Sequence, residues 1–356
     1  MAIIAGWQNS INLAWERPLG TLGTSGFRWC SDQPDSLSVG AVPYARSVLG
    51  NRFHRQEDLR ILKVQPQGAL GATPFWFDAD NWQKTLNRLL NSHFQNAESS
   101  CPTPPEPGWD YHFPYSGQPG TLGGFTIARD IGLGLGRAYV FEKCIMNKLV
   151  VDWKVGQPVM LTPTFYSQNV TPNSSVSGVV FASDTSYQRH YYQAPGISCS
   201  WNGTRFHPAS FKITSSNNIQ TQFGPSRKQP IGFTLGVFEA TLEMDVWVDE
   251  NFYSRFVYID GLGTSVTPVS TLGTFMVRIQ GPEFNEYGGS FGTVFAQTDI
   301  YFTGKIVDVP SCNPNMGNEA TQKVKMIMTA TGTTPAKSGY YIKTYGIPDP
   351  WQPIDK

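Results

Sequence analysis

The sequence feature that most restricts the fold is an alternation of apolar and polar side chains over residues 237–248. The apolar set, Phe238, Ala240, Leu242, Met244, Val246 and Val248, alternates with Glu239, Thr241, Glu243, Asp245 and Trp247. A two-residue period is typical of a β-strand with one buried face, whereas a helix repeats every 3.6 residues. Residues 159–166 alternate in the same way, and Pro163 in their middle predicts a strand at the edge of a sheet.

Composition extends the expectation of a mostly β fold to the whole chain. The 356 residues include 35 Gly and 26 Pro, and 13% are aromatic. Gly and Pro form turns and aromatic residues favour strands, so we expect short strands joined by turns. Only 15% of the residues are charged, against about 25% in typical soluble proteins. Interface cores are depleted in charge, so the low value predicts a surface that is covered by partners.

The formal net charge is zero, with 27 Lys and Arg against 27 Asp and Glu. A neutral chain has no general attraction to nucleic acid, and its copies repel one another little. Both properties favour self-assembly. The basic clusters Arg52–Arg55 and Arg227-Lys228 are interpreted as solvated surface.

Two segments carry the signals of helices. Asp80 and Gln83 form an N-terminal capping pattern, and apolar residues at helical spacing predict a helix over residues 80–94: Trp82, Leu86, Leu89, Leu90 and Phe94. Asp249 begins a second, shorter segment of this kind. Further strands are expected at residues 61–64, 74–77, 121–129, 139–145 and 148–153.

Residues 98–120 are rich in proline and glycine, which predicts a long irregular loop without a central strand. Aromatic residues alternate inside it: Trp109, Tyr111, Phe113 and Tyr115. Loops of this length usually have a function of their own. We expect this one to be ordered by packing against something else.

The second half of the chain repeats features of the first in the same order. Residues 121–125 (Thr-Leu-Gly-Gly-Phe) recur as residues 271–275 (Thr-Leu-Gly-Thr-Phe). Three further pairs of segments follow that order: residues 139–143 with 300–304, residues 159–166 with 324–329, and the helix start at Asp80 with that at Asp249. The repeat predicts two tandem copies of one β-domain, residues 1–167 and residues 168–356, each with a short flanking helix. The polar segment 167–176 is the candidate boundary.

Two glycine-rich motifs resemble catalytic or phosphate-binding loops only formally. Gly288, Ser290 and Gly292 fit G-x-S-x-G, but no histidine follows His207, and hydrolases with this motif place their histidine after the serine. Gly132, Gly134 and Gly136 are not followed by a helix pattern that could bind phosphate. Both are interpreted as loops between strands.

Histidines and cysteines do not form ligand patterns. None of the five histidines lies at metal-ligand spacing from a cysteine or a carboxylate: His54, His93, His112, His190 and His207. His93 falls on the predicted helix, where a surface or half-buried position is expected. The five cysteines are odd in number and lack C-x-x-C spacing: Cys30, Cys101, Cys144, Cys199 and Cys312. The sequence predicts no enzyme: no catalytic, cofactor-binding or metal-binding residue, and no cofactor.

Residues 1–7 have no basic segment and no long apolar segment, so we expect no signal peptide. No stretch approaches the roughly 18 apolar residues of a membrane span. We therefore expect synthesis in the cytoplasm, with the cysteines reduced.

Two segments resemble the tail tube (major tail) proteins of long-tailed bacteriophages. Gly6-Trp7, followed by residues 15–21 (Trp-Glu-Arg-Pro-Leu-Gly-Thr), is similar to the family's opening, and residues 139–151 are similar to a segment that contains a conserved cysteine. The resemblance extends diffusely over most of the chain. One departure is Glu142-Lys143, where the family often has glycine before the cysteine.

This resemblance implies β-sandwiches or rolled sheets flanked by a helix, with six such domains forming a ring. Inner strands join into a barrel, rings stack through long loops, and genomic DNA passes through the lumen during genome ejection. A chain with two domains would form a pseudo-hexameric ring as a homotrimer. The implied partners are further copies of the chain, a tape measure protein, double-stranded DNA held non-specifically, and tail terminator and tip proteins. The implied location is the virion tail.

Two other classes remain open. A non-enzymatic binding or decoration protein of a virion, such as a carbohydrate-binding baseplate or capsid module, would use some of the 15 Tyr and 10 Trp as stacking platforms for sugars. A β-sandwich hydrolase would need a pair of carboxylates, and no such pair is evident in the sequence.

Overall fold

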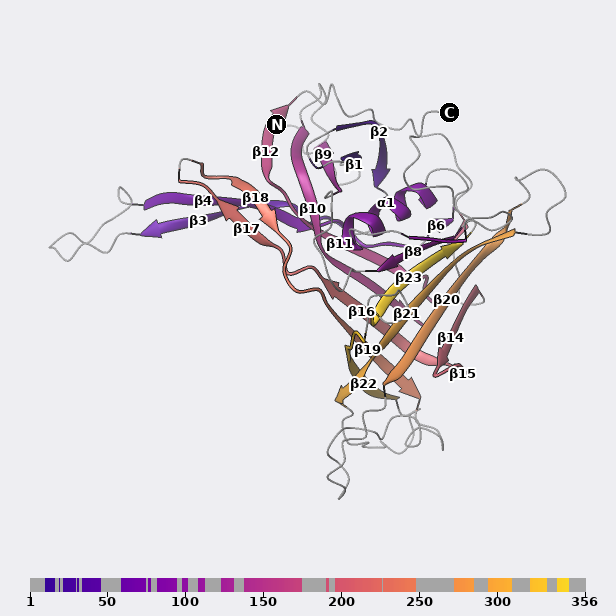
Figure 1. Ribbon diagram of the computed structural model, residues 1–356. Coiled ribbons are helices and arrows are strands. Elements are labelled where there is room, and N and C mark those ends of the chain that lie inside the picture. The colour runs from indigo at the N-terminus through magenta and orange to yellow at the C-terminus, as the bar shows by residue number, and fades with distance from the viewer. Residues whose placement is uncertain are drawn as a thin grey trace, which may run out of the picture.

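The structure is a computed structural model. It describes residues 10–16, 19, 22–29, 31, 34–45, 59–74, 76–77, 82–94, 98–101, 108–112, 123–130, 138–174, 190–191, 196–225, 227–247, 272–284, 294–308, 321–331 and 338–345. In these residues the chain is mostly β with a single helix, and the strands pair antiparallel (Figure 1). The expectation of a mostly β protein is confirmed.

Most of the long strands lie in one continuous sheet, called the long sheet here. Its order is β3–β4/β5–β11–β10–β16–β19–β22–β21. The bounds are β3 (Ser38–Ala45), β4 (Leu59–Ala69), β5 (Thr73–Pro74), β11 (Met160–Tyr166), β10 (Ala138–Lys154), β16 (Pro208–Ser216), β19 (Glu239–Trp247), β22 (Thr321–Met328) and β21 (Val294–Asp308). The alternation predicted for residues 237–248 is confirmed by β19, in which Ala240, Leu242, Met244 and Val246 are buried.

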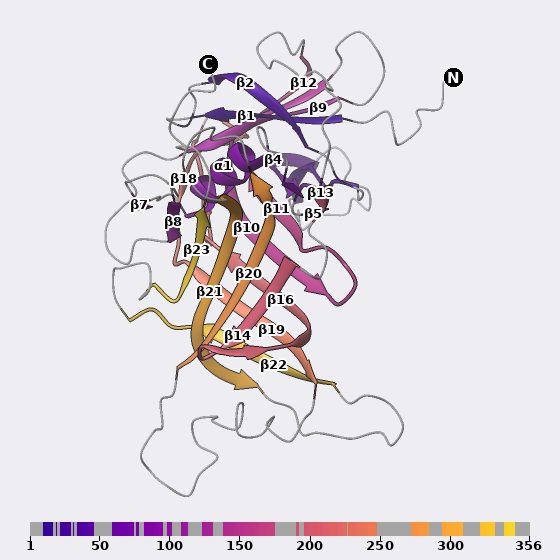
Figure 2. The same cartoon turned by 90° about the vertical axis from the view of Figure 1, so that its right-hand side faces the viewer.

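Two further groups of strands pair with the N-terminal parts of β10 and β21. Beside β10 lie β9 (Gly124–Asp130), β1 (Ser10–Glu16), β2 (Leu22–Trp29) and, on the other edge, β12 (Asn169–Ser174). Beside β21 lie β20 (Gly273–Phe284), β14 (Ile197–Trp201), β15 (Thr204–Phe206) and, on the other edge, β23 (Tyr340–Tyr345). In Figure 2 the first group lies at the upper end of the molecule and the second group extends below it.

Two hairpins project from the molecule on the same side (Figure 1). One is formed by β3 and β4, and the other by β17 (Gln220–Phe223) and β18 (Pro230–Thr234). They are joined where the Val64 amide donates a hydrogen bond to the Lys228 carbonyl (2.8 Å) and where the Lys63 ammonium lies 4.8 Å from the centre of the Phe223 ring. We call this pair the hairpin arms.

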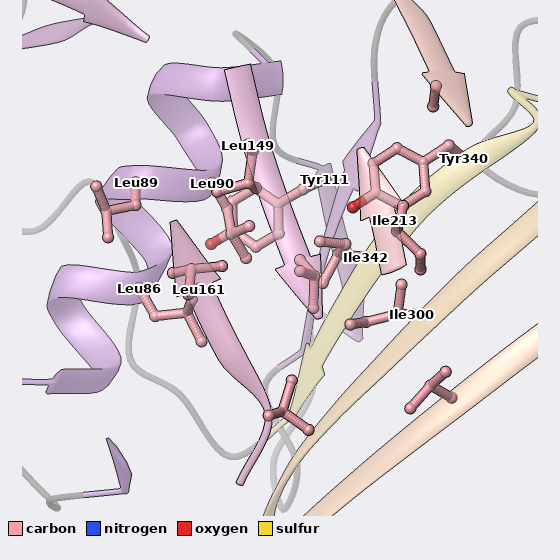
Figure 3. Packing of buried hydrophobic residues seen from close by; sticks show 14 of the residues in the cluster. Leu86, Leu89, Leu90, Tyr111, Leu149, Leu161, Ile213, Ile300, Tyr340 and Ile342 are labelled. Atoms are coloured by element: carbon pink, nitrogen blue, oxygen red, sulfur yellow. The ribbon is translucent and has the colours of Figure 1, made fainter. Parts of the chain in front are cut away.

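Helix α1 (Trp82–Phe94) confirms the helix predicted at residues 80–94. Its apolar side chains Leu86, Leu89, Leu90 and Phe94 are all buried, and Figure 3 shows Leu86 and Leu90 facing Leu161 and Leu149 of the long sheet. The helix position expected at Asp249 lies outside the described residues. The described part of the chain has no helix long and apolar enough to cross a membrane.

The core is continuous and contains side chains from both halves of the sequence. Phe94 of α1 lies 5.8 Å from the Phe238 ring and 5.4 Å from the Tyr340 ring. Phe302 of β21 lies 6.1 Å from the Tyr340 ring. Aromatic pairs at these separations pack favourably beyond the effect of their buried area, so α1 is held against strands that are distant in sequence.

The prediction of two strands at residues 139–145 and 148–153 is wrong, because they form the single strand β10. Its register with β11 shifts between Met146 and Lys148, a bulge that bends a strand without ending it. Asn147 at the bulge is held from outside the pair: its carbonyl accepts from the Asn217 amide (2.7 Å) and its side-chain oxygen from the Ile219 amide (2.9 Å).

Pro163 does not mark an edge strand, so that prediction is also wrong. β11 has β10 on one side and β4 and β5 on the other. Pro163 lies opposite the gap between β4 and β5, where no donor is required of it, and its carbonyl accepts from the Leu70 amide (3.0 Å). The interruption in the neighbouring strand makes the proline tolerable inside the sheet.

The prediction of an irregular loop at residues 98–120 is wrong for residues 98–101 and 108–112, which are strands. Strands β7 (Glu98–Cys101) and β8 (Gly108–His112) form a hairpin, and β8 pairs on its other edge with β23. Tyr111 of β8 is completely buried. A short pair of β6 (Trp76–Phe77) and β13 (His190–Tyr191) completes the described strands.

Strands from both sides of residue 167 pair with one another. Residues 148–154 of β10 pair with residues 210–216 of β16. β8 pairs with β23, and β12, which follows residue 167, pairs with β10. The division into domains 1–167 and 168–356 stays a prediction, since both parts share one sheet and one core.

Candidate assembly interface

His93 is completely buried, so the expectation of a surface or half-buried position is wrong. Its Nε2 lies 2.7 Å from the Ser215 hydroxyl, which is also fully buried. The Asn217 side-chain amide donates to the His93 carbonyl (2.8 Å) and to the Met146 carbonyl (2.9 Å). Burial lowers the pKa of His93 to about 3. The hydrogen bond between His93 and Ser215 connects α1 to β16, and both side chains are buried from solvent. This arrangement suits a structural contact rather than a catalytic serine and its base.

Cys144 and Cys199 are buried free thiols whose pKa values are raised by burial, that of Cys199 to about 12. Thiols in this state are poor nucleophiles and poor metal ligands. In the described ranges no group of three or more His, Cys, Asp or Glu side chains is arranged to hold a metal ion.

Several sequence motifs and candidate residues lie outside the described residues. They are the glycine motifs at 132–136 and 288–292, the basic cluster Arg52–Arg55, and His54. Arg227 and Lys228 lie just before β18, where the Lys228 carbonyl joins the two hairpin arms.

Glu16 is buried and joins β1 to β10. Its Oε1 accepts hydrogen bonds from the Thr126 hydroxyl and from the Lys143 amide (3.2 Å). Lys143 has a φ of 52°, in the left-handed region that favours glycine. Lys143, just before Cys144, thus has a backbone conformation that glycine adopts more readily than lysine.

The described residues 123–125 and 273–275 of the repeated pentapeptides form the same local structure in both halves. Gly123 lies under the Trp15 indole, and a Cβ on this glycine would be 2.8 Å from a ring carbon. Gly273 lies under the Trp201 indole, where the equivalent distance is 2.5 Å. In each half the tryptophan is the register partner of the phenylalanine two residues beyond the glycine.

One face of the long sheet carries polar and charged side chains across β10, β16, β19 and β22. Asp152 is the register partner of Lys212, Lys212 of Glu243, and Glu243 of Lys325. These four residues, called the charge ladder, alternate in sign along a line perpendicular to the strands. The Lys325 ammonium lies 3.7 Å from the Glu243 carboxylate. Burial raises the pKa of Asp152, and the charge of Lys212 acts in the opposite direction.

The two ends of the long sheet differ from its interior. Residues 148–152 of β10 pair with β11 on one edge and with β16 on the other. The C-terminal part of β21 pairs with β22, and its opposite edge has no partner in the described part of the chain. The other end is β3, which among the described strands pairs only with β4. Exposed valines occur at both ends, Val39 on β3 and Val307 on β21.

The alternation in the sequence indicated which strands have a polar face, but not which residues meet across them. A comparison with family models and with curated proteins finds no match to this chain. The inference of function therefore depends on the order and the edges of the strands.

Proposed function

We propose that this chain is a structural subunit of a bacteriophage tail tube, which assembles into stacked rings and forms a conduit for genomic DNA during ejection. The observation that carries the proposal is the order of the long sheet. A run of β3, β4/β5, β11 and β10 is followed by a run of β16, β19, β22 and β21. The pairing of β10 with β16 joins the two runs within one chain.

The second run has the connections of the first. In each half a hairpin, β1–β2 or β14–β15, pairs with a strand that begins near the repeated glycine, β9 or β20. That strand pairs with the N-terminal part of the longest strand, β10 or β21. The C-terminal part of the longest strand pairs with β11 or β22, and these pair with β4 or β19.

This correspondence, with the matching tryptophan–glycine contacts, supports two tandem tail-tube-like domains. The pairing of β12 with β10 favours a boundary after β12 rather than at residue 167. The shared core supports domains that fold as one body.

The junction between β10 and β16 is a template for the contact between chains. If the strand order of the long sheet continues from one chain to the next, the uncovered edge of β21 in one copy pairs with β3 of the next copy. Such a head-to-tail contact forms closed rings when the rotation closes. Six domains close the ring in three copies, a homotrimer with pseudo-sixfold symmetry.

The hairpin arms are the described segments best suited to join one ring to the next. They project on one side of the molecule (Figure 1), and Ile231 of β18 is exposed on them. Residues 98–120 suit this role less well, because their strand β8 is paired on both edges.

Negative-stain microscopy of the purified protein, and of virions from its source, tests the proposal. The expected images are rings with threefold symmetry that stack into tubes of the same width as the virion tail. A protein that stays monomeric at high concentration and is absent from virions would contradict the proposal.

A non-enzymatic binding module of the virion is the second candidate. The feature that favours it is an aromatic pair on the surface: the Tyr301 and Tyr341 rings are stacked with centroids 4.4 Å apart, and both residues are partly exposed. Flat aromatic surfaces bind sugar rings. A specific ligand on a glycan array, lost in Tyr341→Ala, together with no self-assembly, would favour this candidate over the tube.

A further inference from the structure

Val39 of β3 is an apolar side chain left exposed on the face of the long sheet that forms the core. Its register partner on β4 is Pro66, which is buried. Gly68, two residues further along the same face of β4, is the register partner of the fully buried Phe165. Leu37, two residues before Val39, belongs to the core as well. Val39 is nevertheless 43% exposed, so the core is open at this position.

The internal repeat gives Val39 a counterpart in the second half of the chain. A row of register partners crosses β11, β4 and β3: Tyr166, Gln67 and Ser38. A second row crosses β22, β19 and β16: Ile327, Thr241 and Thr214. Each row starts opposite a residue of the longest strand, Ile145 or Lys305, that lies two positions before the bulge of that strand. The rows are therefore equivalent, and the residue after each row is Val39 in the first half and Ser215 in the second.

Ser215 shows what covers this position where the core is complete. It is fully buried, and two of its neighbours belong to the first half of the chain. His93 of α1 lies 2.7 Å from its hydroxyl, and its register partner Leu149 of β10 accepts a hydrogen bond from that hydroxyl through the carbonyl (3.3 Å). The core face of β16 is thus closed by the other half. Val39 lacks such a cover, because β3 pairs only with β4 among the described strands.

The same template places a neighbouring copy beside Val39. Lys148, directly after the bulge of β10, is the register partner of Ser216. The equivalent pair across the proposed contact between chains is Asp308 of β21 and Gly40 of β3. This register brings the C-terminal end of β21 in one copy next to Val39 of the other.

We propose that the second half of one copy covers Val39 of the next, so that the hydrophobic core of each first half is completed by another chain. The inference rests on the proposed function as a ring-forming subunit, and it adds a buried apolar contact to the pairing of strand edges. Burial of an exposed apolar side chain favours association. A single chain can therefore fold with a charged residue at position 39, whereas a ring would have to bury that charge.

The first test measures whether Val39 becomes covered. Val39→Cys is treated with a maleimide as single chains, below the concentration at which rings form, and again as rings. Val155→Cys is the matched control, because Val155 is 55% exposed in the turn after β10, and the unsubstituted protein gives the background from native cysteines. Labelling of Val39→Cys is expected to slow by about tenfold or more in rings, because the thiol then reacts only when the contact opens. Labelling of Val155→Cys should stay the same.

The second test asks whether assembly needs this contact. Val39→Asp is expected to give folded single chains by circular dichroism. The concentration needed for rings, measured by sedimentation velocity, should rise by about tenfold or more, because the ring would bury an unpaired charge. Val155→Asp adds the same charge on an exposed turn and should assemble like the parent.

The outcomes separate the inference from the proposed function. If the unsubstituted protein forms neither rings nor tubes, both are overturned. If rings form but Val39→Cys reacts as fast in rings as in single chains, or folded Val39→Asp assembles like the parent, only the completion of the core by a second copy is overturned. The labelling test decides alone if Val39→Asp does not fold.

Discussion

The two longest strands, β10 and β21, occupy corresponding positions but have different surroundings. β10 has neighbours on both edges along almost its whole length: β9 and β16 on one edge, β12 and β11 on the other. β21 has β20 and β23 beside its N-terminal part, but only β22 beside residues 305–308 within the described residues. The described part of the chain thus contains one completed junction and one edge of the same kind that lacks its second neighbour.

The difference teaches where a partner has to bind. Exposed strand edges are normally blunted by charge, proline or bulges, because they otherwise pair with another chain. β21 carries a bulge between Ile306 and Asp308, yet Val307 beside it is exposed. The following predictions test whether this edge is an unfinished copy of the β10 junction.

Blocking the edge of β21 should have the largest effect. Val307→Pro removes an amide donor from the edge, so we expect folded protein that forms no rings, with at least a tenfold rise in the concentration needed for assembly. Val307→Ala keeps the amide and is the matched control. Sedimentation velocity measures assembly and circular dichroism measures folding. Normal rings from folded Val307→Pro would show that this edge is not the contact.

Truncating the same part of each long strand compares the two environments directly. Leu149 of β10 is fully buried, whereas Ile306 of β21 is only partly buried. We expect Leu149→Ala to lower the free energy of unfolding by about 3 kcal/mol, and Ile306→Ala to lower it by about 1 kcal/mol in the monomer, because less of that side chain is removed from water.

Urea denaturation of the monomers measures both values. The cost of Ile306→Ala should rise when the assembled protein is denatured, since the edge is then covered. Equal costs for the two variants in the monomer would contradict the difference in environment.

Acid should weaken the completed junction through His93. Its folded pKa, about 3, lies below the ordinary value of 6.5, so between these values the unfolded chain takes up a proton that the folded chain does not. Above pH 6.5 the contribution of His93 to the free energy of unfolding does not change. Below pH 6.5 the free energy of unfolding falls by about 1.4 kcal/mol for each pH unit, which is roughly 2 kcal/mol at pH 5.

The measurement is the free energy of unfolding from pH 8 to pH 5 for the parent and for His93→Gln. The variant is expected to lose less stability between pH 6.5 and pH 5. Parallel curves for the two proteins would show that His93 is not buried as a neutral side chain.

The smallest effect is expected at Lys143 of β10. A non-glycine residue in the left-handed region costs about 1 kcal/mol, so Lys143→Gly should stabilise the protein by up to that amount. Thermal unfolding measures the change, and Lys148→Gly in the same strand is the control, which should destabilise. A lower melting temperature for Lys143→Gly would argue against the left-handed backbone at this position.

Local patterns in the sequence predicted the elements that depend on nearby residues. The helix at Trp82–Phe94 and the strand at Glu239–Trp247 could be predicted because their apolar faces are periodic. The matched pentapeptides at 121–125 and 271–275 also indicated a repeated local structure, and both contain a glycine beneath a tryptophan.

Features that depend on distant partners could not be predicted. β8 lies between prolines and glycines and is a strand because β23, far along the chain, pairs with it. The charge ladder needs the register of four strands, and a slip of one residue would turn each side chain to the other face. His93 is buried because Ser215 of β16 and Asn217, just after that strand, pack against it, a contact that no pattern near residue 93 indicates.

Crosslinking between β21 and β3 is the sharpest test of the proposed contact between chains. Val39→Cys and Val307→Cys are made as separate chains, mixed under assembling conditions, and treated with a short bismaleimide, with the unsubstituted protein as background. Head-to-tail pairing of β21 with β3 predicts covalent dimers that contain one chain of each kind, and no increase over background for either variant alone. Rings that form without a mixed dimer, or dimers formed by either variant alone, would contradict it.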